Sequence, residues 1–344
     1  MTTRETSAPI LLVPYVWIGD FVRCHSVVQL LQARWPGRPV DILSSTLCAP
    51  LAAYMPGVRK AVVHDLPRGR LAYGENARLA EKLKPEHYGA ALIMSRKWKA
   101  ALAPYLAGIP ERVGFLGEMR FLLLNDIRPG EKQFKTMAEQ CAALALPRGG
   151  KLPPLPEPKL KASEAQIKSW RARTGIEKGG KRAVALAPGS VWRSKRWPIA
   201  HYARLAALLG ARGYEIWIVG GRDEKPLAEA IRAAVPAARD LTDLDLGDGA
   251  LALGEADAAV SNDSGALHMA AAFGTPTLAL FGPTDPGAWM PLNKSAKALL
   301  GPEPLDCRPC AEHDCPLGHH KCLVDLAPQA VFAEVERALA HSRS

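Results

Sequence analysis

Residues 257–285, DAAVSNDSGALHMAAAFGTPTLALFGPTD, most constrain what this chain can fold into. The short apolar run that begins at Asp257 leads into residues 261–265, whose types favour turns and helix N-caps. A helix of small residues is predicted over 266–273, where glycine and proline stop it, and a second buried strand over 277–281. The stretch therefore predicts a strand, a tight turn, a helix and a strand.

The helix that begins in this turn would point free N–H groups beyond the carboxyl end of a parallel strand. Its dipole favours an anion there, and a nucleotide diphosphate is the obvious candidate. Ser264 and His268 are four residues apart and share one helix face, with Asp263 just before them. An ordinary crossover with a capped helix fits the same pattern, and a lone His268 is typical of a histidine packed among its neighbours.

The same alternation of strands and helices occurs twice in the 344 residues, on either side of a segment rich in proline and glycine at 147–158. This predicts an α/β protein with two doubly wound domains and a cleft between them. We place the domains at residues 1–155 and 156–327. A last helix within 328–344 has no strand after it, and we expect it to cross back and brace the first domain.

The formal net charge of +10 favours an acidic partner, such as nucleic acid, anionic lipid or a phosphorylated substrate. The cations are scattered, which argues against a nucleic-acid-binding arm and also fits a plain solvated surface. The longest apolar run, Ile10–Ile18, is about half the length that spans a bilayer, and no cleavage-site pattern follows it. We therefore expect a cytoplasmic protein without a transmembrane segment. Seven cysteines, an odd number, argue against a fully paired disulfide framework.

Two segments carry groups suited to catalysis. Asp20 follows a strand and a glycine, where a carboxylate serves either as a general base or as a helix N-cap. In the segment 190–198, SVWRSKRWP, three cations lie close together before a helix that begins near Pro198. Such a cluster beside a helix N-terminus favours a bound anion over a merely solvated face.

Two further segments leave alternatives open. Residues 111–126 mix Arg120 and other charges with large apolar side chains, which fits either an anionic group of a second substrate or a plain strand, loop and helix. Four cysteines cluster near several histidines, and the first pair has zinc spacing. Either a structural metal or a set of reduced, oxidation-prone thiols fits this pattern, whose members are Cys307, Cys310, Cys315 and Cys322.

Long ungapped segments in both halves of the chain resemble one family. They are WIGD at 17–20, AGIPERVGFLGEMRFLLLND at 107–126, KRWP at 195–198, the stretch at 261–286 and the cysteine-rich stretch at 307–322. The chain is similar to the bacterial ADP-heptose:LPS heptosyltransferases, glycosyltransferase family 9, and among them to the type II enzymes. The resemblance implies a GT-B fold, in which two Rossmann-like domains face a central cleft, with the acceptor on the N-terminal domain and the nucleotide sugar on the C-terminal one.

The resemblance also implies roles for single residues. Asp20 matches the base that deprotonates the acceptor hydroxyl, and Lys195 matches the lysine that neutralises the leaving ADP. An acidic residue after Gly220-Gly221, either Asp223 or Glu224, is expected at the adenosine ribose. Arg120 falls in a segment of the acceptor domain, and from this we infer that it contacts the acceptor. The remaining residues of the donor site are expected to be Ser190, Asp263, Ser264, Gly265 and His268.

The implied reaction is an inverting, metal-independent transfer of L-glycero-D-manno-heptose from ADP-heptose to the first heptose of the LPS inner core, on its Kdo2–lipid A side. The enzyme would work at the cytoplasmic face of the inner membrane and bind no nucleic acid. The alternatives are a type I or III enzyme, a relative that uses another nucleotide sugar, and a nucleotide-sugar epimerase. A zinc-dependent nucleic-acid-binding protein is the alternative from another class, and a structural zinc at the cysteines is left open.

Overall fold

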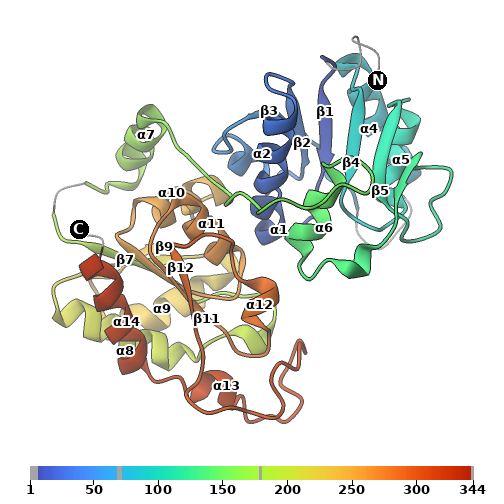
Figure 1. The fold of residues 1–344 in the computed structure, drawn as a ribbon. Coiled ribbons are helices and arrows are strands. Elements are labelled where there is room, and N and C mark those ends of the chain that lie inside the picture. The colour runs from blue at the N-terminus through green and yellow to red at the C-terminus, as the bar shows by residue number, and fades with distance from the viewer. Residues whose placement is uncertain (1–6, 68–71, 178–179, 342–344) are drawn as a thin grey trace. The chain divides into compact units, whose positions relative to one another are not determined.

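The computed structural model describes residues 7–67, 72–177 and 180–341 of the chain. The chain divides into two compact units, Met1–Lys159 and Leu160–Ser344 (Figure 1). The first unit extends past the predicted end at residue 155 because the chain after Leu155 is still bonded to it. Ser26 Oγ donates to the carbonyl of Pro156 at 2.6 Å, and His25 Nδ1 accepts from the backbone N–H of Lys159 at 2.9 Å.

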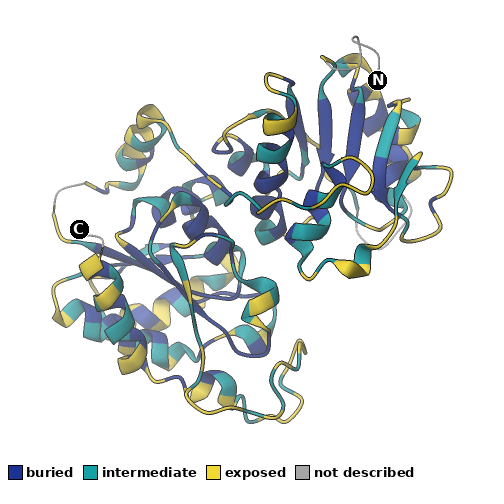
Figure 2. Ribbon diagram, in the orientation of Figure 1, coloured by how far each residue is buried: buried dark blue, intermediate teal, exposed yellow. Residues whose placement is uncertain are grey.

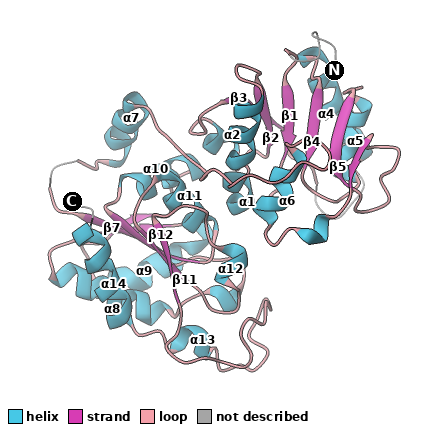
Figure 3. Ribbon diagram, in the orientation of Figure 1, coloured by secondary structure: helices cyan, strands magenta, loops and turns pink. Residues whose placement is uncertain are grey.

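The N-terminal unit is built on one sheet of six parallel strands in the order β3-β2-β1-β4-β5-β6 (Figure 3). The strands are β1 (Ile10–Val13), β2 (Val40–Ser44), β3 (Val58–Val63), β4 (Ala90–Ile93), β5 (Glu111–Phe115) and β6 (Asp126–Arg128). The helices are α1 (Ile18–Arg23), α2 (His25–Arg34), α3 (Ala49–Ala52), α4 (Tyr73–Leu83), α5 (Lys99–Leu106) and α6 (Met137–Leu144).

The central strands are continuous apolar runs because both of their faces are covered, as Figure 2 shows. Every residue of β1 and of β4 is buried. Strand β1 stops before Pro14, whose nitrogen has no hydrogen for the ladder. The two helices that follow, α1 and α2, meet at Cys24.

The C-terminal unit repeats the plan with a second parallel sheet, in the order β12-β11-β10-β7-β8-β9. Its strands are β7 (Ala183–Ala187), β8 (Glu215–Val219), β9 (Arg239–Leu241), β10 (Ala258–Asn262), β11 (Thr277–Leu280) and β12 (Ala296–Leu299). Its helices are α7 (Glu164–Thr174), α8 (Ile199–Ala211), α9 (Lys225–Ala234), α10 (Leu246–Glu255), α11 (Gly265–Phe273), α12 (Pro286–Trp289), α13 (Lys321–Val324) and α14 (Pro328–His341).

The last helix, α14, packs within the C-terminal unit, and the expectation that it also braces the first domain stays a prediction. It contacts α8, β10 and β11. Val331, Val335 and Leu339 lie on one face of the helix and are at most 1% exposed in the core of this unit. Their spacing of four residues makes an apolar stripe that the neighbouring helix α8 covers. Among the described helices, none is both long and apolar enough to cross a membrane.

Both sheets have the doubly wound order 3-2-1-4-5-6 when their strands are numbered within each unit. In such sheets the chain leaves the first strand in one direction and later returns to its other side, which opens a crevice at the carboxyl ends of the two central strands. These switch points lie between β1 and β4 in the first unit and between β7 and β10 in the second. Ligands of doubly wound proteins bind at such crevices.

Candidate functional site

The loops after three adjacent strands of the C-terminal unit carry most of the predicted donor residues. Ser190 and Lys195 follow β7, Asp263 and Ser264 follow β10, and Glu224 follows β8. Because parallel strands end at one edge of the sheet, these loops surround the β7–β10 switch point. The structure therefore brings the donor residues predicted from the sequence together at the β7–β10 switch point of this unit.

Lys195 is held at this edge by an ion pair and two aromatic rings. Its Nζ lies 2.7 Å from Oδ2 of Asp263, 4.6 Å from the ring centroid of Trp192 and 5.6 Å from that of Trp289. Thr284 Oγ1 donates to the same carboxylate oxygen at 2.7 Å. Asp263 is 5% exposed and Lys195 is 15% exposed, so the pair is largely shielded from water. An ammonium with three N–H groups keeps donors for a second anion when one carboxylate binds it.

Helix α11 begins directly after Asp263. Ser264 takes the N-cap position but makes no side-chain cap bond, and its Oγ lies 3.2 Å from Oγ of Ser261 instead. The first-turn N–H groups, which begin at Gly265, have no partner inside the helix, and the dipole makes this end positive. His268 lies one turn further on and is only 3% exposed.

Asn262, which the sequence analysis did not single out, joins the loop after β7 to the end of β10. Its Nδ2 donates to the carbonyl of Pro188 at 2.7 Å, and its Oδ1 accepts from the backbone N–H of Trp197 at 3.0 Å. The side chain is fully buried. The sequence signal for this role was an asparagine between a buried strand and a helix N-cap, since a buried side-chain amide needs several hydrogen-bond partners. Ser190 lies in the loop so fixed, and its carbonyl accepts from Arg196 Nε at 2.7 Å.

Glu224, and not Asp223, turns back toward the strand ends. Its carboxylate accepts from the backbone N–H of Gly221 and reaches across to Gly189 in the loop after β7. A methyl group on Gly189 would lie 2.8 Å from Glu224 Cγ and closer still to the carboxylate. Asp223 is exposed. The missing side chain at Gly189 is therefore what makes room for the carboxylate of Glu224.

Asp20 lies in the first turn of α1, the helix that follows β1 at the switch point of the N-terminal unit. The N-cap of this helix is Trp17, so the alternative that Asp20 is the N-cap is wrong. Asp20 is 9% exposed, and Arg23 NH2 lies 3.4 Å from its Oδ1. Both side chains line a small pocket together with Tyr15. Burial, with smaller contributions from neighbours that include Asp20, raises the pKa of Tyr15 to about 12, so its hydroxyl stays protonated at neutral pH.

Arg120 does not reach a surface where an acceptor could touch it, so the expected acceptor contact is wrong. The side chain is 1% exposed and donates to four backbone carbonyls. The distance from NH1 to the carbonyl of Ser95 is 2.6 Å, and that from NH2 to the carbonyl of Phe115 is 2.5 Å. Burial lowers the pKa of Arg120 to about 10. The guanidinium holds together the loops after β4 and β5 by satisfying their carbonyls.

The cysteine-rich segment 307–322 docks on the turn that carries Lys195. Ser194 N–H donates to the carbonyl of His313 at 3.1 Å, its Oγ donates to the carbonyl of Glu312, and Nε2 of His320 donates to the Ser194 carbonyl at 2.6 Å. Ser194 is 3% exposed. These three bonds make the cysteine-rich segment part of the support of the Lys195 turn, which the sequence did not indicate.

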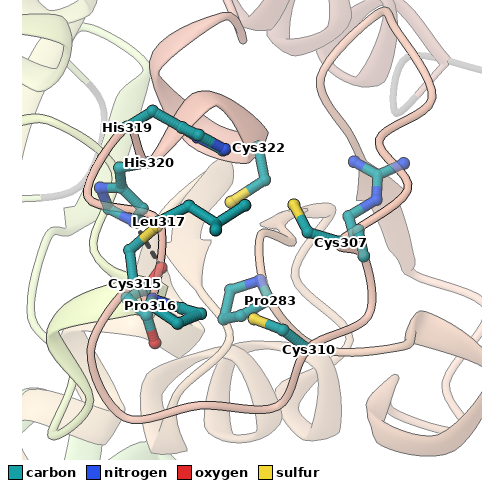
Figure 4. Close-up of a pocket in the computed structure, with 11 residues that line it drawn as sticks. Pro283, Cys307, Cys310, Cys315, Pro316, Leu317, His319, His320 and Cys322 are labelled. Atoms are coloured by element: carbon teal, nitrogen blue, oxygen red, sulfur yellow. Dashed lines mark hydrogen bonds between the residues drawn. The ribbon is translucent and has the colours of Figure 1, made fainter.

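The four cysteines of this segment line one pocket, and their side chains are drawn around it in Figure 4. Burial opposes ionisation of Cys315, but backbone N–H groups of His320, Leu317, Gly318 and His319 outweigh it and lower the pKa of this thiol. Burial and the neighbouring thiols raise the pKa of Cys322 to about 11. All four are free thiols. Within the described ranges, no three His, Cys, Asp or Glu side chains are grouped so as to hold a metal ion.

A family sequence model and the curated relatives described here point to the same protein family. The sequence model of glycosyltransferase family 9 (heptosyltransferase) matches residues 76–321. The lipopolysaccharide heptosyltransferase 2 of Escherichia coli K12 is 33% identical over 347 residues, which cover 96% of this chain and 98% of that protein. The lipooligosaccharide heptosyltransferase 2 of Haemophilus influenzae is 32% identical over 351 residues, which cover 96% of this chain and 99% of that one.

A solved structure agrees with these sequence matches. The structure of E. coli ADP-heptose LPS heptosyltransferase II superposes with a TM-score of 0.86 at 31% identity, and the match covers 98% of this chain and 100% of that one. The predicted fold class, a GT-B fold of two Rossmann-like units, is confirmed by this match and by the two doubly wound sheets.

Proposed function

Because the chain belongs to glycosyltransferase family 9, the heptosyltransferases, we propose that it transfers L-glycero-D-manno-heptose from ADP-heptose to the first heptose of the LPS inner core, on its Kdo2–lipid A side. The two relatives described above each match over 96% of the chain, and both carry the name heptosyltransferase 2. A type I enzyme is therefore less supported, and the same holds for a type III enzyme or another nucleotide sugar.

The observation that carries the donor half of the proposal is the paired cation at the β7–β10 switch point. Lys195 and the start of α11 bring positive charge to one edge, and Asp263 orients the lysine. A diphosphate is the anion that such an arrangement suits. Ser190 and Gly265 would contact it through the loop and the helix start, with Ser264 and His268 on the same helix.

For the adenosine ribose we propose Glu224. Its carboxylate lies in the room left by Gly189, between the loops after β7 and β8. A carboxylate beside a nucleotide-binding strand edge accepts hydrogen bonds from ribose hydroxyls. Asp223 is the weaker choice because its side chain is exposed and the described contacts do not bring it to this edge.

The chemistry proposed is a direct displacement with inversion at the anomeric carbon. Asp20 accepts the proton of the acceptor hydroxyl, the acceptor oxygen forms the new bond to the anomeric carbon, and the bond to the diphosphate oxygen breaks. ADP leaves with the bonding electrons, and Lys195 with the N-terminus of α11 stabilises its charge. These groups supply positive charge from the protein itself, so the proposed transfer requires no metal ion.

The acceptor half of the proposal assigns the N-terminal unit to the LPS inner core. Its switch point carries Asp20, with Arg23 3.4 Å away to keep the carboxylate oriented. The inner-core acceptor carries Kdo carboxylates and lipid A phosphates, which suit a chain of net charge +10. We accordingly place the enzyme in the cytoplasm, at the inner face of the inner membrane.

The test is a transfer assay with ADP-heptose and defined acceptors that already carry zero, one or two heptoses. We expect transfer to the acceptor with one heptose and none to the acceptor with zero. Transfer to the acceptor with zero heptoses would instead identify a type I enzyme. The Asp20→Asn variant is expected to lose transfer by more than a hundredfold and to keep ADP-heptose binding, measured by calorimetry. Retained turnover in this variant would refute the assignment of the base.

A further inference from the structure

The loop between β5 and β6 displays three large apolar side chains to solvent. Met119 is 84% exposed, Phe121 is 56% exposed and Leu122 is 84% exposed. Single exposed apolar residues are common on protein surfaces, but three within four positions form a patch that calls for an explanation.

The structure holds this loop firmly in place. Arg120, which lies between the apolar residues, is buried and bound to carbonyls of the same loop and of the loop after β4. Glu118 accepts from the backbone N–H of Trp98 at 3.1 Å and from Lys97 Nζ at 2.6 Å. Gly117 has φ +53, and a Cβ on it would lie 2.8 Å from the Arg96 Cβ. The apolar side chains are therefore exposed by a fixed backbone and not by a frayed one.

Cations surround the apolar patch on the loops that flank it. The loop after β4 carries Arg96 and Lys97, helix α5 begins with Lys99, and the loop after β6 carries Lys132 and Lys135. The nearby carboxylates are Glu118, which lies in the loop after β5 and pairs with Lys97, and Glu131, which lies in the loop after β6 and pairs with Arg96 at 3.4 Å. Five cations against two carboxylates leave the surroundings of the patch positive.

This combination of rigid apolar tips and surrounding cations suits the surface of an anionic bilayer. Apolar side chains enter the boundary between head groups and acyl chains, while lysines and arginines meet the anionic head groups. The patch lies at the carboxyl edge of the sheet, the same edge that carries Asp20. A lipid-linked acceptor would be met at this edge, and in this respect the inference rests on the function proposed above.

We propose that the loop 117–123 is a membrane-docking loop, which inserts Met119, Phe121 and Leu122 into an anionic lipid surface and brings the N-terminal unit to its acceptor. A protein partner or a second copy of the chain suits the patch less well. Three side chains make a small apolar area for a protein interface, and the flanking lysines favour an anionic surface.

The experiment measures co-sedimentation of the full chain with vesicles of phosphatidylethanolamine and phosphatidylglycerol, and with neutral phosphatidylcholine vesicles. We expect binding to the anionic vesicles that weakens with salt, and little binding to the neutral ones. The variant Met119→Ser/Leu122→Ser should bind the anionic vesicles about tenfold more weakly. The variant Lys132→Gln/Lys135→Gln, in which both substituted lysines are exposed, should lose most of the preference for anionic lipid.

The matched control is Leu317→Ser, which changes an apolar side chain that is 61% exposed in the C-terminal unit. It should bind vesicles like the wild type. Because the substituted side chains are exposed, the thermal unfolding midpoints of all variants should match that of the wild type, and sedimentation equilibrium should show no change of oligomeric state.

Several outcomes would overturn the proposal. They are wild-type protein that does not bind anionic vesicles, the Met119/Leu122 variant binding as tightly as the wild type, and a change of oligomeric state in that variant. Vesicle binding is measured without donor or acceptor, so it tests membrane docking by the loop even if the heptosyl transfer proposed above is not observed. If transfer is observed, the Met119/Leu122 variant should lose activity on acceptor in vesicles and keep it on a water-soluble, deacylated acceptor. Equal loss on both acceptors would assign the loop to the acceptor site and also overturn the docking role.

Discussion

Replacing Gly189 with alanine is the sharpest test of the proposed donor site, because one methyl group reaches the carboxylate of Glu224. The new Cβ would lie 2.8 Å from Glu224 Cγ, whereas ordinary contact begins at 3.4 Å, and it would overlap the carboxylate itself. Gly189 has no positive φ, so alanine does not strain the backbone there. The carboxylate must therefore swing away and give up its bond from the backbone N–H of Gly221.

The size of the effect follows from the hydrogen bonds that the displaced carboxylate can no longer make. A hydrogen bond to a charged group contributes about 1.5–3 kcal/mol. If Glu224 binds the ribose, Gly189→Ala should weaken ADP-heptose binding by roughly tenfold to a hundredfold. Isothermal titration with ADP and with ADP-heptose measures this directly, and both ligands should be affected alike because both carry the ribose.

A double-mutant cycle separates this mechanism from general damage to the site. Gly189→Ala should cost little in a Glu224→Ala background, because the methyl group then has no carboxylate to displace. The control Gly210→Ala lies in α8, where the nearest atom to the new Cβ is Val235 Cγ1 at 3.7 Å, and should leave binding unchanged. Wild-type affinity in Gly189→Ala, or full additivity with Glu224→Ala, would refute the reasoning.

Three further predictions concern other parts of the two units. Lys195→Ala should weaken ADP-heptose binding about tenfold or more and slow transfer, and Asp263→Asn should produce a smaller loss of the same kind, both measured by titration and steady-state kinetics. Arg120→Met should lower the free energy of unfolding of the N-terminal unit by on the order of 3 kcal/mol in urea titrations, because buried carbonyls lose their donor. At pH 8, iodoacetamide should modify Cys315 well before Cys322, because the pKa of Cys315 is lowered and that of Cys322 is raised to about 11; mass spectrometry of quenched samples checks the order.

The sequence was sufficient to predict the two α/β units because buried parallel strands are continuous apolar runs with turns after them. The strands β6, β9 and β12 cannot be predicted in this way, because each lies far from the centre of its sheet, has three or four residues and mixes polar with apolar side chains. Helix α10 is hard to predict because glycines interrupt its pattern, LGDGALALGE. Local composition therefore predicts the centres of both sheets better than their edges.

Only those features of the candidate site that lie within a single segment of the chain could be predicted from the sequence. Asp263, Ser264 and Lys195 lie in loops whose residue types indicate an anion, but the pairing of Lys195 with Asp263 joins residues far apart in the chain. The choice of Glu224 over Asp223 depends on the room at Gly189, on another strand. Arg120 misled the prediction because a buried arginine and a ligand-binding one look alike in sequence. What separates them is the set of carbonyls that folding brings to the guanidinium.

The position of Asp263 indicates how a negatively charged side chain can lie in the proposed donor site. A carboxylate that faced a diphosphate directly would repel it. In the structure, Oδ2 of Asp263 is occupied by Thr284 and Lys195, so its negative charge is directed at the lysine. For the proposed donor site we infer that Asp263 positions Lys195, so that the shielded ammonium is in place before the donor binds. The hydrogen bonds between Ser194 and the cysteine-rich segment hold the same turn from its other side. Electrostatic stabilisation of a leaving diphosphate is most effective when the cation is already in place. A cation that must first be ordered spends part of its interaction energy on that reorganisation when the bond breaks.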